Sequence, residues 1–287
     1  MSVRRAVVAG QFYESDPKRL QSQLSSCFTS EFGPGSLPGK KTSKKIFGCV
    51  SPHAGYVFSG PAAAFCYKAV AEAKLPSTFV VIGPNHTGYG SDFATSSDDW
   101  ETPLGRVEVD RVFVKKLVDK CDFVSDDSSA SMVEHSVEVQ LPFLQFISDN
   151  KFKFVPLVLA SHDLDDLELL GKAIASVDRD VCVVASSDFT HYGVGYGYLP
   201  FSDKRKERMY ELDKKGISPI VSLDVSGFVS HVKKVDATIC GYAPIITTMF
   251  AVKALGCKRG YLLNYYTSGD VINDYSSAVG YASIIFV

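Results

Sequence analysis

Short apolar runs alternate along this chain with segments whose apolar positions repeat at helical spacing. Runs rich in β-branched or aromatic residues have the length of buried strands, at 46–50, 79–82, 152–159 and 181–185. Helical patterns separate them, at 60–73, 112–121, 137–147 and 164–175. This alternation predicts an α/β fold, in which a mostly parallel or mixed central sheet is flanked by helices.

Both ends of the chain extend the pattern. An acidic N-cap at Asp16 and a proline at position 17 predict the start of an amphipathic helix. Near the C-terminus we expect a helix at about 244–255 and strands at 261–266 and 278–287. The segment 31–45 is rich in Gly, Pro, Ser and Lys, which is typical of a surface connection. We therefore expect residues 1–287 to form a single domain.

Composition narrows the class of protein. A hydrophobic fraction of 46% with 22% charged residues is typical of a packed globular chain. The net charge of −2 is not that of a protein that binds nucleic acid through its phosphates. Apolar runs are too short to cross a bilayer or to form a signal-peptide core, so we expect a cytoplasmic protein without a membrane partner. The 7 cysteines are scattered without C-x-x-C spacing, which predicts reduced thiols.

Ionisable side chains follow three of the predicted strands directly. His53 comes after the run 46–50, His86 after 79–82, and Asp188 and His191 after 181–185. In an open α/β sheet, ligands bind outside the carboxyl ends of the strands, where the connecting loops converge. These residues are therefore expected to lie together at that edge of the sheet.

Two imidazoles and one anionic ligand would leave open positions on a first-row transition metal, as in mononuclear non-haem iron sites. His53 and His86 supply the imidazoles, and the sequence offers Asp188, Glu134 and Cys240 as the third ligand. Cys240 stands just before a predicted helix, where the helix dipole and free amides would favour a thiolate.

Other polar segments have plainer interpretations. Glu134 and Glu138 would lie one turn apart on the helix that they open, and His135 between them could face the cleft. The charged segment 203–215 is expected to be a solvated helix face, and His162 and His231 are expected to be exposed.

A serine hydrolase is a competing hypothesis. Ser186, Ser187, Asp188 and His191 cluster in the sequence. Catalytic triads, however, are assembled from separate loops, and the chain contains no G-x-S-x-G elbow. This hypothesis would require Ser187 to be an accessible nucleophile.

Taken together, the motifs resemble the Memo family, named for a mediator of receptor-driven cell motility. The resemblance runs from end to end and rests on the segments 9–13 (AGQFY), 52–56 (PHAGY), 83–86 (GPNH), 134–136 (EHS), 186–191 (SSDFTH) and 238–241 (TICG). That family is similar in fold to class III extradiol dioxygenases, whose iron is held by two histidines and a glutamate.

The resemblance implies that His53, His86 and Cys240 occupy the three ligand positions and hold iron or copper, with zinc possible. It implies that His191 acts as an acid/base group and that Asp188 supports the metal. Asn85, Glu134, His135 and Ser187 are expected around the pocket. Because Cys240 replaces the carboxylate ligand, ring-cleaving activity does not carry over.

Two functions follow as expectations. The first is a metal-dependent redox or dioxygenase-like protein acting on a small molecule. The second is a non-catalytic module that keeps the cleft to bind a peptide as an adaptor. The resemblance also implies radical-SAM and AMMECR-type proteins as partners in one pathway.

Overall fold

The computed structural model describes residues 2–287, and a mixed 12-stranded sheet runs through it. Its centre is parallel, and the neighbouring strands are, in order, β6 (Gly105–Val109), β8 (Lys153–Leu159), β3 (Thr78–Pro84), β9 (Val181–Ser186) and β2 (Gly48–Ser51). Strands β3, β8 and β9 carry almost continuous apolar runs because both faces of the sheet are covered.

The remaining strands extend the sheet at both ends. Beyond β2 lie antiparallel β12 (Ala278–Phe286), β11 (Gly260–Thr267) and β10 (His191–Tyr192). At the opposite end lie β1 (Val3–Arg4), β4 (Phe93–Thr95), β5 (Asp99–Thr102) and β7 (Ser125–Asp126). The predicted α/β fold with a mixed sheet is confirmed.

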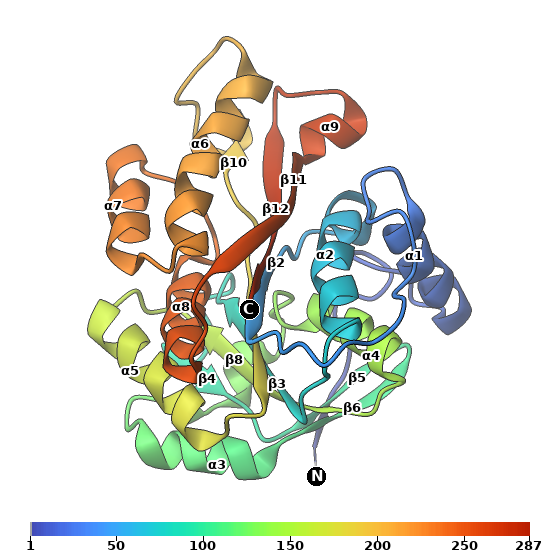
Figure 1. Ribbon diagram of the computed structural model, residues 1–287, viewed down its shortest axis with the longest axis vertical. Helices are drawn as coiled ribbons and strands as arrows, with labels where there is room; N and C mark the ends of the chain where they lie inside the picture. Colours follow the sequence, from blue (N-terminus) through green and yellow to red (C-terminus); the bar gives the residue numbers. More distant parts are fainter. Residues whose placement is uncertain (1) are drawn as a thin grey trace.

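Helices cover both faces of the central strands (Figure 1). One layer contains α3 (Arg111–Lys120), α5 (Leu164–Val177) and α8 (Tyr242–Leu255). The other contains α1 (Pro17–Thr29), α2 (Tyr56–Ala71) and α4 (Leu141–Ser148). Helices α6 (Arg205–Val221) and α9 (Ser268–Ile272) pack against β11 and β12, and α7 (Val225–Val235) packs against α6 and α8. One apolar core joins the sheet to these layers.

Local signals placed several helices correctly. Helix α1 begins at Pro17, and the Asp16 carboxylate accepts hydrogen bonds from the backbone N–H groups of Lys18 and Arg19. Among residues 2–287, no helix is both long and apolar enough to cross a bilayer.

Other expectations were wrong at their boundaries. Helix α2 begins at Tyr56 rather than at residue 60, immediately after the loop that carries His53. The helix expected from residue 137 is a 3-10 turn, Glu138–Gln140, followed by α4. Glu134 therefore lies before this turn and outside any helix, and it does not share a helical face with Glu138. The short strands β4 to β6 were missed because their runs are brief and cross-strand pairing, rather than apolar length, stabilises them.

Two expectations of exposure also need correction. Helix α6 is not solvated throughout, since Met209 and Asp213 are buried on its inner face. His162 is exposed as expected, but His231 is half-buried against Gly216. All 7 cysteines are free thiols, and only Cys240 is not fully buried.

Candidate metal centre

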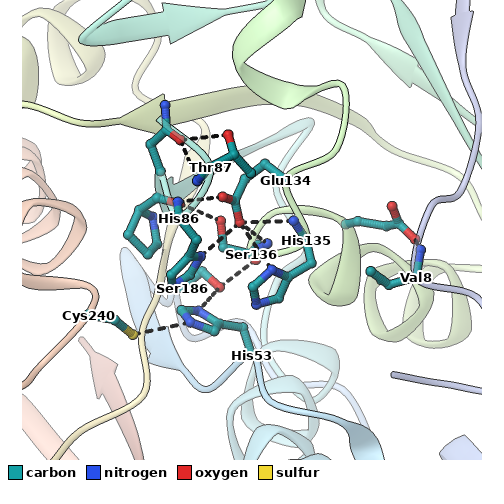
Figure 2. Close-up of polar contacts among 12 residues, drawn as sticks. Val8, His53, His86, Thr87, Glu134, His135, Ser136, Ser186 and Cys240 are labelled. Carbon is teal, nitrogen blue, oxygen red and sulfur yellow. Dashed lines mark hydrogen bonds and ion pairs between the residues drawn. The ribbon is translucent and has the colours of Figure 1, made fainter. Parts of the chain in front are cut away.

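The carboxyl ends of β2, β3 and β9 bring the predicted site residues together. His53 follows β2, His86 follows β3, and Cys240 lies just before α8. The His53 Nε2 atom lies 3.2 Å from Cys240 Sγ. One potential ligand atom from each of these three residues lies within 4.8 Å of the other two. Figure 2 shows His53 and Cys240 in contact, with His86 and His135 beside them.

A buried hydroxyl holds the His53 ring. His53 Nδ1 lies 3.0 Å from Ser186 Oγ, at the end of β9, which turns Nε2 toward Cys240. Burial lowers the pKa of His53 well below its ordinary value, and the neighbouring His86, His135 and His191 lower it further. The ring is therefore neutral near pH 7, the form in which imidazole binds a metal.

The Glu134 carboxylate holds His86. Its oxygens accept hydrogen bonds from the backbone N–H groups of His86, His135 and Ser136 and from His86 Nδ1, at 2.6–3.0 Å. Burial would raise the pKa of Glu134, but the His86 side chain and the Ser136 amide lower it to about 2. Three of these donors contact Oε1 and one contacts Oε2, so Glu134 is held as a group that orients His86.

Asp188 supports His53 and Cys240 through the main chain. Its Oδ1 accepts a hydrogen bond from the His53 N–H at 2.9 Å, and its own N–H donates to Cys240 Sγ at 3.3 Å. Burial raises the pKa of Asp188. Asp188 thus fixes the loop of His53 through its carboxylate and contacts Cys240 through its backbone N–H.

The position of Cys240 before α8 does not favour a thiolate, contrary to the sequence argument. Burial and the negative charge of Asp188 raise the pKa of the Cys240 thiol, and these effects outweigh the nearby amides. Cys240 is therefore held as a thiol, with its Sγ atom 3.2 Å from His53 Nε2 and 3.6 Å from the Asp188 carbonyl oxygen, and a bound metal ion would have to displace the thiol proton.

Two further histidines line the site. The His135 ring lies against the rings of His86 and Phe12, at centroid distances of 4.7 Å and 4.6 Å. Burial and the nearby His86 lower the pKa of His135 to about 4, against the opposing effect of Glu134. His191 Nδ1 donates a hydrogen bond to the Thr238 carbonyl at 2.9 Å, so the ring is held through Nδ1 rather than through Nε2.

Two predicted pocket residues have structural contacts instead. Ser187 is fully buried, donates its proton to the Asp188 carbonyl and accepts from the Gly241 N–H. It is not the accessible nucleophile that serine hydrolysis requires. Asn85 accepts hydrogen bonds from Thr87 and Gly88, and so shapes the loop after His86.

The donor set fits a transition metal better than a hard cation. Two imidazoles and a sulfur are ligands typical of copper, zinc or iron, whereas magnesium and calcium prefer oxygen. His86 is exposed and Cys240 partly so, and the site is therefore open to solvent on that side. A second group, His86, Glu134 and His135, also has nitrogen and oxygen atoms within 4.8 Å, but the Glu134 oxygens are occupied as described.

Comparison with known proteins identifies the family of this chain. The model of the family described as Memo-like protein matches residues 4–285. The chain belongs to the Memo-like family. A MEMO1 family protein of Methanopyrus kandleri is 47% identical to it over 289 residues, covering 99% of this chain and 98% of the relative. One of Nitrosopumilus maritimus is 40% identical over 288 residues, covering 99% and 100%.

A solved structure shares the architecture of this Memo-like protein. The crystal structure of an uncharacterized protein from Escherichia coli K12 has a TM-score of 0.54 and 15% identity to it. The match covers 85% of this chain and 100% of that chain. At this identity, the likeness shows the fold alone.

Two residues that support the site histidines, one directly and one through Ser186, were not predicted from the sequence. Thr238 binds His191 through its backbone carbonyl and its hydroxyl. Gln140 reaches Ser186 from the turn before α4. Thr238 stands two positions before Cys240, which could have drawn attention to it, but nothing in the local pattern distinguishes Gln140.

Proposed function

We propose that this Memo-like protein binds one transition-metal ion, iron or copper, through His53, His86 and Cys240, for redox or dioxygenase-like chemistry. Zinc would fit the same ligands. The observation that carries the proposal is that both imidazoles are anchored through Nδ1, at Ser186 and at Glu134, while His53 Nε2 faces the Cys240 sulfur. Anchoring of this kind is typical of metal-binding histidines.

A metal held there would supply a redox-active Lewis acid with positions open to a ligand. The chain's own groups would then position a substrate and move protons. His191 Nε2 is the group suited to proton transfer, because Nδ1 is held by Thr238. Asp188 would keep the loops of His53 and Cys240 in place. Ring cleavage of the extradiol type is not expected, since a thiol stands where those enzymes have a carboxylate.

The test is elemental analysis of protein purified anaerobically under reducing conditions. We expect near-stoichiometric iron, copper or zinc in the native chain, and its loss in His53→Ala, His86→Ala and Cys240→Ser. His162→Ala, at an exposed histidine outside the three ligands, is the matched control and should keep its metal. Little metal in the native chain, even after reconstitution, would contradict the proposal and favour the peptide-binding alternative.

Redox chemistry needs its own measurement. We expect the metal-loaded protein to consume oxygen in the presence of a general reductant such as ascorbate, and Cys240→Ser to do so no faster than the buffer. Metal binding without any oxygen consumption would limit the proposal to a metal-binding role.

A further inference from the structure

A buried chain of hydrogen bonds leads from the helix layer to His53. Gln140, which is 1% exposed, accepts from the Tyr67 hydroxyl at 2.6 Å through Oε1. Its Nε2 donates to the Pro52 carbonyl at 2.9 Å and to Ser186 Oγ at 2.8 Å. Because a carbonyl only accepts, the contact with Pro52 fixes which end of the amide is the nitrogen.

The direction of every proton in this chain then follows. The Ser186 hydroxyl has one proton, which it donates to the Ser136 carbonyl at 2.6 Å. One of its lone pairs accepts from Gln140, and the other faces His53 Nδ1 at 3.0 Å. With no proton left to give, Ser186 can only accept from His53. The ring must therefore carry its proton on Nδ1 and present an unprotonated Nε2 to Cys240.

We propose that Gln140 is a positioning residue: its donation to Ser186 Oγ helps to hold that hydroxyl with its proton on the Ser136 carbonyl and a lone pair toward His53 Nδ1, which keeps His53 Nε2 available to a metal. It touches neither the proposed ligand atoms nor the open side of the site. Its effect reaches His53 only through Ser186. The consequence for metal affinity rests on the proposed function, whereas the tautomer is a property of the metal-free protein.

Replacement of Gln140 by methionine, which has a similar shape without hydrogen-bonding groups, tests this. Without the amide donor, the Ser136 carbonyl alone holds the Ser186 hydroxyl, so the hydroxyl can also turn and donate to His53 Nδ1, and the Nε2–H tautomer gains population. In ¹⁵N NMR of the metal-free protein, we expect His53 Nε2 to be unprotonated in the native chain and to shift toward the protonated value in Gln140→Met. Metal affinity should fall about 10- to 100-fold, as for other residues that orient a ligand.

Gln145→Met is the matched control. Gln145 is 3% exposed, lies in α4 shortly after Gln140, and also uses both ends of its amide, toward Thr102 and Gly105. This variant loses comparable buried hydrogen bonds, but it should keep the native His53 tautomer and metal affinity. Any general effect of loosening the turn before α4 and α4 itself would appear in both variants.

The outcomes separate the two proposals. A native tautomer in Gln140→Met, or an equal shift in Gln145→Met, would overturn the role of Gln140. Absence of metal from the native chain, together with the expected tautomer shift, would support Gln140 while overturning the metal proposal. If Gln140→Met does not fold, Tyr67→Phe tests the same contact. The Gln140 amide then loses the hydroxyl that holds its oxygen, so its Nε2 is less firmly directed at Ser186 and the His53 signal should shift less, in the same direction. No shift would contradict the proposal.

Discussion

Glu134 contacts His86 twice, through the ring Nδ1 at 3.0 Å and through the backbone N–H at 2.6 Å. The same carboxylate also accepts from the N–H groups of the two residues that follow it. One buried anion thus fixes the loop after β3, the ring that it carries and the start of the next segment. This is why a residue that resembles a metal ligand by type is an orienting group here.

Glu134→Gln is expected to weaken metal binding without removing a ligand. The amide would place an N–H donor among groups that are themselves donors, so His86 would lose its fixed orientation. We expect a loss of about 10- to 100-fold in metal affinity, measured by competition with a chelator. The exposed Glu108→Gln is the control. Equal affinity in the native chain and Glu134→Gln would show that Glu134 does not orient His86.

Cys240→Asp should change which metal the site prefers. Replacing sulfur by a carboxylate oxygen makes the ligand set similar to that of the two-histidine, one-carboxylate iron sites. Affinity for Cu(I) should fall more than affinity for Fe(II), as measured by competition between the two metals under anaerobic conditions. An unchanged ratio would mean that Cys240 is not a ligand.

Arg4 should contribute strongly to folding stability. Its guanidinium forms an ion pair with the buried Glu138, donates to the carbonyls of Ser131 and Glu134, and lies 4.0 Å from the Trp100 ring centroid. Arg4→Leu leaves the Glu138 carboxylate without its cation, which should lower the free energy of unfolding by about 3–5 kcal/mol.

Urea denaturation measures this loss, with the exposed Arg5→Leu as the control. A double variant, Arg4→Leu with Glu138→Gln, should recover part of the stability because no unpaired charge remains. If Arg4→Leu and Arg5→Leu lowered the free energy of unfolding equally, the Arg4–Glu138 ion pair would not stabilise the fold.

Asp213 should make stability fall with rising pH. Burial raises the pKa of this carboxyl from 3.8 to about 6, although Thr190 and Tyr265 donate hydrogen bonds to it. The native state therefore holds the proton more tightly than the unfolded chain does. The contribution of Asp213 to the free energy of unfolding is fully present below about pH 4 and is lost as pH rises through about 6. The difference amounts to about 3 kcal/mol.

Asp213→Asn isolates this effect, because the amide stays neutral at every pH. The free energy of unfolding of the native chain, relative to Asp213→Asn, should fall between about pH 4 and 6 and then level off. Denaturation series over this range measure it, and the other titrating groups cancel because both proteins contain them. A constant difference would show that Asp213 is not buried as a neutral acid.

Much of the framework could be predicted from local pattern. Long apolar runs identified β3, β8 and β9, and the cap at Asp16 identified the start of α1, because these signals depend on residues close in sequence. The segment from β4 to β6 was missed, since its short strands pair with β8 and with one another rather than burying long apolar runs.

The sequence by itself determined that His53, His86 and Asp188 lie at one edge of the sheet, because each follows a strand and parallel strands end at the same edge. Only the tertiary structure decided their roles. It placed Glu134 beneath His86, although the two residues are far apart in the chain, and it occupied both carboxylate oxygens. It also connected Gln140 to His53 through Ser186. Hydrogen-bond partners of this kind depend on which segments pack together, and no local periodicity records that.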